Sequence, residues 1–179
     1  MIKAETTIIP GLFILSNQVF TDERGSFKKL LSESDFNRLS LESNFAEIYY
    51  SINNKNVIRG MHFQIPPMDH VKIVYVSRGI ALDVCLDLRQ GSNTFGKCFS
   101  ITLTDNDELY LYIPKGIAHG FASLEGDTIV NYAQTSNYSK EHDFGIKYDS
   151  FGFEWPVDKP IISKRDMEFP NFQDWNSVF

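Results

Sequence analysis

Short apolar runs separated by turn residues follow one another from about residue 45 to residue 135. VKIVYV ends at SRG, IALDVCLDL ends at RQGSNTFG, and CFSITLT turns at DNDE into LYLYIP. In the last run, Leu109, Leu111 and Ile113 alternate with Tyr110 and Tyr112, which is the period of two that a β-strand requires. Both sets are apolar, so we expect strands covered on both faces. The pattern predicts an all-β fold and is compatible with a barrel, an immunoglobulin-like sandwich or a jelly roll.

Few helices are expected beside these strands. The main candidate is SESDFNRLSLE, where Ser32 or Ser34 could cap the N-terminus, and a second follows Ser163 in SKRDMEF. The 179 residues, of which 42% are hydrophobic, are enough for one well-buried core. We therefore predict a single domain over residues 1–179, with the aromatic tail FPNFQDWNSVF packed on the body or on a partner subunit.

Charge and composition argue against several classes of partner. The formal net charge is -6, and basic residues are mixed with acidic ones instead of forming the stripe that a nucleic-acid backbone requires. No apolar segment approaches the roughly 20 residues that cross a bilayer. The first residues, MIKAETTIIPG, lack the apolar run of a signal peptide. We therefore expect a cytoplasmic protein, with Cys85 and Cys98 as reduced thiols.

Two motifs suggest a cupin with an incomplete metal site. PKGIAHGF, which contains His119, resembles the second motif of the cupin jelly rolls, and RGMHFQ lies where their first motif carries His-x-His. Residues i and i+2 of a strand face the same way, so His62 and Gln64 would point into the barrel together. An amide is a poor metal ligand compared with imidazole, and we predict no metal. A metal-dependent cupin such as a dioxygenase is the alternative, and it predicts stoichiometric transition metal in the purified protein.

A longer ordered set of motifs resembles the dTDP-4-dehydrorhamnose 3,5-epimerase family. The family's DERG is matched by residues 22–25, its RGLHxQ by residues 59–64 and its IPxGxAHGF by residues 113–121. DLRQGSNTFG and WPVDKPIISKRD match two further motifs. The resemblance implies a metal-free, cupin-type jelly-roll barrel with a few short flanking helices, which generally forms homodimers.

The resemblance also implies an acid–base reaction next to a ketone. The family inverts carbons flanking the ketone of a nucleotide-linked 4-keto-6-deoxy sugar. His62 would be the base, because an imidazole with a reference pKa of about 6.5 can accept a proton at neutral pH. Asp166 would hold its ring, Lys72 would stabilise charge on the ketone oxygen, and Tyr132 would return a proton on the opposite face.

Further positions are implied to bind the substrate. Arg24 and Arg59 are candidates for the diphosphate, because a guanidinium fork fits phosphate oxygens. His119 would line the sugar pocket beside Lys72 as a hydrogen-bond donor, and Tyr138 would lie near the nucleotide. Asp83 is a possible supporting carboxylate, and because it lies among apolar residues we expect it to have a partner.

Other positions near the expected site depart from the family pattern. Lys29 replaces a glutamate, Glu47 and Tyr49 replace a Gln-x-Asn pair, and Arg165 replaces the lysine before Asp166. If these positions read the base or ribose, as in the family, the nucleotide need not be dTDP. Gln64, which matches the family pattern, is a further candidate for substrate binding. The segment IPPMDH before Lys72 would rim the pocket and could alter which sugar fits.

We therefore predict a cytoplasmic, cofactor-independent isomerase that acts at C3, C5 or both carbons and supplies a deoxysugar for polysaccharide or another glycosylated product. A nucleotide-sugar 3,4-ketoisomerase is one alternative, although Tyr132 together with Lys72 argues mildly against it. A non-catalytic sugar-nucleotide-binding cupin is another, and it predicts binding without hydrogen exchange. The residues assign no role to His70 or His142.

Overall fold

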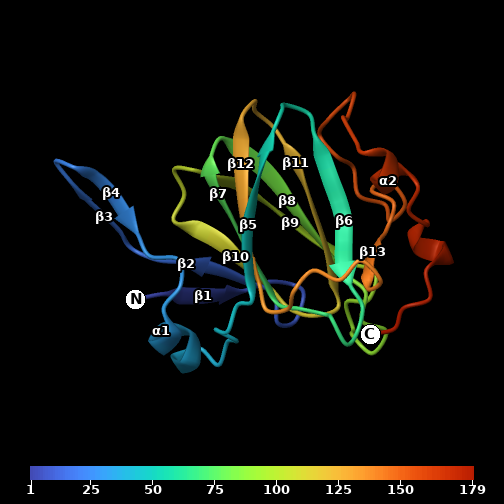
Figure 1. Ribbon diagram of the computed structural model, residues 1–179, viewed down its shortest axis with the longest axis horizontal. Coiled ribbons are helices and arrows are strands. Elements are labelled where there is room, and N and C mark those ends of the chain that lie inside the picture. Colours follow the sequence, from blue (N-terminus) through green and yellow to red (C-terminus); the bar gives the residue numbers. More distant parts are fainter.

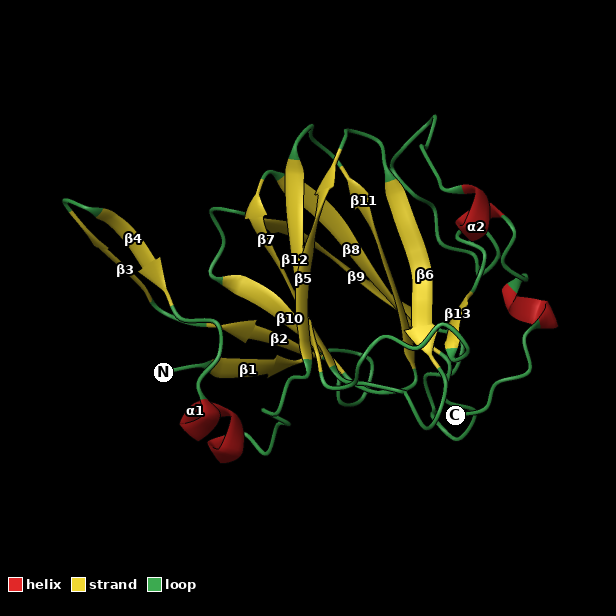
Figure 2. Ribbon diagram, viewed as in Figure 1, coloured by secondary structure: helices red, strands yellow, loops and turns green.

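Two antiparallel β-sheets pack face to face in the computed structural model, which describes residues 1–179 (Figures 1 and 2). In spatial order, the first sheet contains β1 (Lys3–Thr6), β2 (Phe13–Ser16), β10 (Leu109–Ile113), β7 (Lys72–Arg78), β12 (Thr128–Gln134) and β5 (Glu47–Asn53). The second contains β13 (Asp143–Gly145), β6 (Ile58–Gln64), β11 (Ile117–Ser123), β8 (Ile80–Asp87) and β9 (Cys98–Thr104). The predicted cupin-type jelly-roll class is confirmed by this arrangement and by the solved structures described below.

The strands are buried on both faces, as the alternation predicted. Leu111 and Ile113 of β10 point into the core between the two sheets. Tyr110 and Tyr112 point to the outer face of the same sheet, where they pack with Phe36. A third apolar cluster covers the outer face of the five-stranded sheet. Each fully buried aliphatic or aromatic side chain stabilises the fold by roughly 1.5–3 kcal/mol, so these layers hold the two sheets in register.

Both predicted helices form, but they are short. Helix α1 (Glu33–Arg38) begins after Ser32, which is extended and makes no side-chain capping bond. Helix α2 (Lys164–Met167) begins after Ser163, whose hydroxyl accepts a hydrogen bond from the backbone nitrogen of Asp166 at 3.0 Å. Neither has the length or the apolar run needed to span a bilayer.

The aromatic tail packs on the body of its own chain. It contains one 3-10 turn (Phe172–Asp174), and Phe172, Trp175 and Phe179 pack against the cluster outside the five-stranded sheet. The ring of Trp175 meets that of Phe63 edge-on, with centroids 5.2 Å apart. The tail thereby covers the outer face of the sheet that carries His62.

A projecting hairpin was not predicted from the sequence. Strands β3 (Val19–Asp22) and β4 (Gly25–Lys28) pair only with each other, and the hairpin extends away from the two sheets (Figure 1). Phe20 and Phe27 face one another across it and are 57% and 61% exposed. A strand pair without a buried face has no apolar/polar alternation, so this segment gave no strand signal.

Two glycines let β6 and β11 approach closely. A Cβ atom added at Gly60 would lie 2.5 Å from the Cα of Gly120. Gly60 also has a φ of +130°, a backbone conformation that residues with a side chain rarely adopt. Beside them, His62 and His119 are cross-strand partners, and the register shifts between His119 and Phe121. The glycines of the RG and HG pairs in the sequence thus bring two histidines together.

Candidate active site

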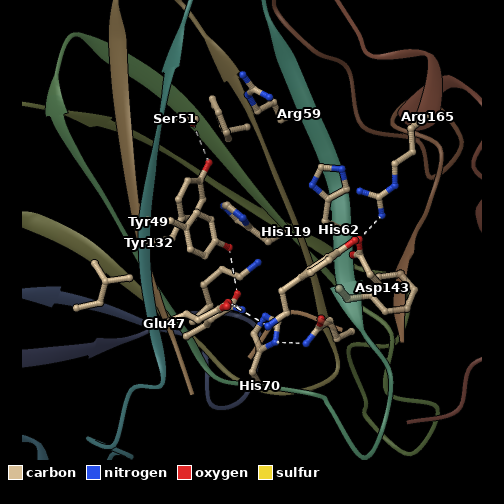
Figure 3. Close-up of a pocket in the computed structure, with 17 residues that line it drawn as sticks. Glu47, Tyr49, Ser51, Arg59, His62, His70, His119, Tyr132, Asp143 and Arg165 are labelled. Carbon is tan, nitrogen blue, oxygen red and sulfur yellow. Dashed lines mark hydrogen bonds and ion pairs between the residues drawn. The ribbon is translucent and has the colours of Figure 1, made fainter. Parts of the chain in front are cut away.

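A cavity of about 560 Å³ opens between the two sheets and contains most of the predicted site residues (Figure 3). The wall formed by the five-stranded sheet contributes residues of β6, β11 and β13, among them His62 and His119. The opposite wall, formed by the six-stranded sheet, contributes residues of β5, β7 and β12, among them Lys72 and Tyr132. The arrangement therefore sets two imidazoles against a phenol and an ammonium group.

His62 is held by a carboxylate from the other end of the chain. Its Nε2 lies 3.0 Å from Oδ1 of Asp166, whose Oδ2 accepts a hydrogen bond from the backbone nitrogen of Gly60 at 3.1 Å. Burial disfavours the charged form of Asp166, but the hydrogen bonds from His62 and Gly60 outweigh it, so the pKa of Asp166 lies below its usual value. The His62 side chain is 29% exposed, while that of Asp166 is 5% exposed. The pair thus combines an anchored nitrogen with a ring that reaches the cavity.

Phe169 fixes the same ring from the side. Its centroid lies 5.7 Å from that of His62 in an edge-on geometry. It packs so closely on Gly145 that a Cβ there would lie 2.2 Å from the ring, so only glycine fits. Arg165 lies over the ring of Phe169, 5.1 Å from its centroid, and pairs with Asp143 at 2.6 Å. Helix α2 and the residues after it therefore support the wall that carries His62.

Asp83 has the partner that its burial required. Its Oδ2 lies 2.8 Å from Nε2 of His119, and both side chains are at most 5% exposed. Burial lowers the pKa of His119, which favours the neutral ring. A neutral ring that donates from Nε2 to the carboxylate has a lone pair at Nδ1. His119 can therefore donate to a sugar, as the sequence suggested, only in its imidazolium form; the neutral ring can accept.

Lys72 is the buried cation of the cavity, with 7% of its surface exposed. Burial lowers its pKa to about 8, although the negative charges of Asp143 and Asp83 act in the opposite direction. The side chain is thus mostly charged at neutral pH, and none of its hydrogens is used in a hydrogen bond or ion pair within the protein. An ammonium group with free hydrogens in a cavity is suited to stabilise a negatively charged oxygen.

Tyr132 lies against Tyr49, its cross-strand partner on β5. The two rings stack with centroids 4.8 Å apart and planes at 18°. The Tyr132 hydroxyl lies 3.5 Å from Oγ of Ser51, and burial raises the pKa of Tyr132 above its usual value. The phenol therefore remains protonated at neutral pH, the form in which it can donate a proton.

A hydrogen-bond chain extends this wall from Tyr49 to the rim. The Tyr49 hydroxyl donates to Oε1 of Gln134 at 3.0 Å, and Nε2 of Gln134 donates to Glu47 at 2.7 Å. The same carboxylate oxygen accepts a hydrogen bond from the backbone nitrogen of Tyr138 at 3.0 Å. Glu47 and Tyr49, both departures from the family pattern, are therefore linked to each other and to the loop that carries Tyr138.

Gln64 faces the cavity with His62, but its amide is engaged by the protein. Its Oε1 accepts a hydrogen bond from the backbone nitrogen of Ser139 at 2.6 Å. Its Nε2 lies 2.8 Å from the carbonyl oxygen of Met68 and 3.1 Å from that of Asn137. The residue at the second ligand position of the cupin motif thus joins two loops. No cluster of three or more His, Cys, Asp or Glu side chains is arranged to hold a metal ion.

Two predicted binding residues lie outside this cavity. Arg24 is at the turn of the β3–β4 hairpin, where its side chain is 85% exposed and pairs with Asp22 of the same hairpin. Lys29 follows β4 and is exposed. Arg59, Tyr138 and the remaining predicted residues line the cavity or, like Asp166, support a residue that does.

The sequence reading missed four polar residues of the cavity. Ser51 and Gln134 lie two residues from Tyr49 and Tyr132, so strand alternation could have identified both. His70 precedes Lys72 by two residues at the end of a loop, where no alternation applies. Asp143 lies beyond a long connection that has no periodic signal.

Residues 6–174 match the family described as dTDP-4-dehydrorhamnose 3,5-epimerase. The enzyme of that name from Methanothermobacter thermautotrophicus is 39% identical over 178 residues, which cover 97% of this chain and 95% of the relative. The one from Shigella flexneri is 34% identical and covers 94% of both chains.

Solved structures of a dTDP-4-dehydrorhamnose 3,5-epimerase and of a dTDP-6-deoxy-D-glucose-3,5-epimerase are also similar. The enzyme from Bacillus anthracis, with TDP and pyrophosphate bound, has a TM-score of 0.92 and 32% identity, and the match covers 96% of this chain and 99% of that one. The enzyme from Legionella pneumophila, in complex with dTDP-4-keto-L-rhamnose, has a TM-score of 0.93 and 29% identity, with 98% and 95% covered. Both matches therefore extend over nearly the whole chain.

Proposed function

The chain belongs to the dTDP-4-dehydrorhamnose 3,5-epimerase family, and from that premise we propose that it is an isomerase that inverts C3, C5 or both carbons of a nucleotide-linked 4-keto-6-deoxy sugar. One observation carries the proposal: a histidine–carboxylate pair and a protonated phenol lie on opposite walls of one cavity that also contains a buried ammonium group. Inversion next to a ketone needs a base on one face of the sugar and an acid on the other.

His62 removes the proton in this mechanism. Because Nε2 is bonded to Asp166, the nitrogen left for the substrate is Nδ1. A neutral ring with hydrogen on Nε2 has its lone pair on Nδ1, which can take a proton from the carbon beside the ketone. The charge of Asp166 then stabilises the imidazolium, as in other histidine–aspartate pairs.

Lys72 stabilises the enolate that forms. As the proton leaves, negative charge develops on the ketone oxygen, and an ammonium group in a water-poor site lowers the energy of that charge. Its lowered pKa, about 8, leaves it mostly charged at neutral pH and makes it a stronger proton donor than an ordinary lysine. It can therefore share a proton with the oxygen during the reaction.

Tyr132 completes the inversion by giving its phenolic proton to the carbon from the opposite face. The stacked Tyr49 ring and the hydroxyl of Ser51 restrict the position of the phenol. Substituting phenylalanine for Tyr132 would remove the acid but not the base. We expect this variant to take up solvent deuterium while it forms little inverted product.

The substrate would be a nucleoside-diphosphate sugar, and relatives of this chain carry dTDP-sugars in their names. Arg59 supports this assignment, because its Nε is fixed by Asn53 at 2.7 Å while the rest of its guanidinium fork remains available for a phosphate. Arg165 is a second candidate, although it would have to exchange Asp143 for the diphosphate or bind both. Tyr138, which is 58% exposed at the rim, is available to contact the nucleotide.

We also propose that the protein is a cytoplasmic homodimer in which residues 1–179 act as one domain. The hairpin phenylalanines and the residues Ile48, Tyr50 and Ile52 of edge strand β5 expose apolar surface that a second copy could cover. Arg24 and Lys29 lie outside the cavity of their own chain, so their predicted contact with substrate requires a second copy. Light scattering of the purified protein tests the dimer, and a monomeric mass contradicts it.

The reaction is tested by an NMR time course in deuterated water with dTDP-4-keto-6-deoxyglucose, followed by its GDP and CDP counterparts. We expect deuterium to enter at C3, at C5 or at both with at least one nucleotide. Exchange identifies the carbon and the nucleotide together. Tight binding without exchange of any of the three supports a sugar-nucleotide-binding protein instead, and conversion to a 3-keto sugar supports the ketoisomerase. Metal analysis of the same sample tests the predicted absence of a cofactor.

A further inference from the structure

His70 faces the cavity but has no part in the mechanism above. It ends the connection between β6 and β7, two residues before Lys72, and lines both the main cavity and a small recess beside it. Its neighbours there include His62, Lys72 and His119. A partly buried imidazole among these groups is placed to contact the reacting end of a substrate.

The hydrogen bonds around His70 define where its own hydrogen lies. Nδ1 is 3.2 Å from Oγ of Ser136, and that hydroxyl donates its only hydrogen to the carbonyl oxygen of Met68 at 2.7 Å. Gln64 also approaches Nδ1, at 3.3 Å, but its two amide hydrogens have shorter contacts with carbonyl oxygens. The contact with Ser136 therefore needs a hydrogen on Nδ1.

The other ring nitrogen of His70 is left as an acceptor. Nε2 has no hydrogen-bond partner in the protein. Only two side-chain polar atoms are both buried and unpaired, Tyr110 Oη and Trp175 Nε1, so the unpaired Nε2 of His70 is accessible. It is thus open to the cavity. Burial, together with the positive charge of Lys72, lowers the pKa of His70 to about 3, so the ring is neutral and Nε2 keeps its lone pair at neutral pH.

We propose that His70 is a specificity-determining residue whose Nε2 accepts a hydrogen bond from the sugar hydroxyl on the carbon next to the ketone. This inference rests on the proposed function, and it extends it to the substrate class. Lys72 is a donor suited to the ketone oxygen, and His70 is an acceptor on the same side of the cavity. Together they match an α-hydroxy ketone, which presents an acceptor and a donor on adjacent carbons.

The pairing would orient the sugar. In a 4-keto-6-deoxy sugar the carbon on one side of the ketone, C3, carries a hydroxyl, and the carbon on the other side, C5, carries a methyl group. Only the C3 side offers a hydrogen to Nε2. A sugar turned the other way would leave the His70 lone pair facing a methyl group. Nε2 would then lose the hydrogen bond that it makes with water in the free protein and gain none from the sugar. His70 therefore distinguishes the two sides of the ketone.

The test compares two substrates and two variants. His70→Asn retains a donor near the position of Nδ1 for Ser136 but has no atom at Nε2, whereas His70→Gln places an amide oxygen near Nε2. The substrates are dTDP-4-keto-6-deoxyglucose and the same compound without the 3-hydroxyl. Calorimetry measures the dissociation constants, NMR measures deuterium uptake next to the ketone, and thermal unfolding checks that each variant is folded.

We expect His70→Asn to weaken binding of the 3-hydroxy sugar and raise its KM by about tenfold, the worth of one neutral hydrogen bond, with a smaller change in kcat. Binding of the 3-deoxy sugar should be unchanged, and His70→Gln should keep part of the preference. Equal losses with both sugars, or no loss with either, would overturn the assignment. Because calorimetry needs no turnover, it decides the role of His70 even if the wild-type protein exchanges no deuterium, a result that would count against the epimerase reaction alone.

Discussion

The two walls of the cavity are built in different ways. On the acid wall, Tyr132 is the cross-strand partner of Tyr49 on one side and of Val74 on the other, and Gln134 is likewise flanked by Glu47 and Lys72. Its functional groups thus form rows across one sheet. On the base wall, His62 depends on Asp166, which is 104 residues away in the chain and lies on a four-residue helix.

The acid wall is therefore expected to be the more rigid of the two, and the base wall the more easily altered by substitution. A row of cross-strand neighbours is fixed by the same ladder that holds the sheet together, so a change there affects stability as well as function. The base wall is completed by a segment with little regular structure, docked through Phe169 on Gly145 and Asp166 on His62. Substitutions in that segment should change the rate more than they change stability.

The largest effect is expected for Asp166→Asn on the base wall. The amide cannot stabilise an imidazolium as a carboxylate does, so kcat should fall by roughly 10²–10⁴-fold, the range for loss of general base catalysis. The free energy of unfolding should fall by only about 1 kcal/mol, because Asn still has an oxygen that can accept from Gly60. Asp158→Asn, at an exposed position in the same part of the chain, is the matched control. A loss of stability that accounts for the loss of activity would contradict the separation of the two walls.

Lys72→Met on the acid wall should reduce kcat by about 10²–10³-fold, as the removal of one group that stabilises an oxyanion does. It should also stabilise the protein at neutral pH. In the folded protein the pKa of Lys72 is about 8, lower than the ordinary 10.5. Below pH 8 the charged Lys72 therefore destabilises the folded state relative to the unfolded state by about 3 kcal/mol. This cost diminishes as the pH rises from 8 to 10.5 and then vanishes.

Denaturant unfolding of wild type and Lys72→Met at pH 7 and pH 10.5 measures this difference. The variant should be the more stable protein at pH 7, and the gap should narrow at the higher pH. Lys55→Met, at an exposed position, should show no such change. If Lys72→Met is the less stable protein at pH 7, the ammonium group stabilises the folded state. Its description as a buried cation that destabilises the fold is then wrong.

The pairing of Asp166 with His62 should also contribute to stability in a pH-dependent way, on the order of 1 kcal/mol. The folded pKa of Asp166 is lower than its ordinary value of 3.8. The contribution is therefore complete above that ordinary value and is lost as the pH falls through the lower folded one. Unfolding of wild type and Asp166→Asn between pH 6 and pH 2 should show two curves that converge in acid; parallel curves would mean that the pair adds nothing.

The smallest effect is expected for Tyr49→Phe. The variant keeps the ring that stacks on Tyr132 and loses only the hydrogen bond to Gln134, so stability should fall by about 1 kcal/mol. The rate should change by no more than about threefold, because positions of the reacting groups are kept. Tyr49→Ala, which also removes the stack, should reduce inversion further. Equal kinetics for the two variants would show that the stack does not position the acid.

Strand periodicity predicts which residues share a face of one sheet, but not the contacts that loops bring to that sheet. The alternation in LYLYIP and the run IALDVCLDL predicted strands with two buried faces, and the burial of Asp83 predicted its partner. Residues i and i+2 of one strand identified the shared face of His62 and Gln64. The same rule relates Ser51 to Tyr49 and Gln134 to Tyr132 on the acid wall, because residues i and i+2 of a strand share a face.

The part of the base wall that lies outside the sheet does not follow from periodicity. No local pattern relates Asp166 to His62, and only the resemblance to a known family joined them before the structure did. The lone pair of His70 depends on two loops that meet at Gln64 and Ser136, and no local sequence pattern predicts that meeting. The β3–β4 hairpin was missed for the opposite reason, since it has no buried face to leave a pattern.

The most direct test of the two-wall account is a comparison of His62→Asn and Tyr132→Phe in deuterated water, in which deuterium uptake next to the ketone and formation of inverted sugar are measured in the same samples. The account predicts that His62→Asn loses both uptake and inversion. It predicts that Tyr132→Phe keeps uptake within about tenfold of wild type while inversion falls by roughly 10²-fold or more. Equal loss of uptake and inversion in Tyr132→Phe would contradict the assignment of base and acid to opposite walls.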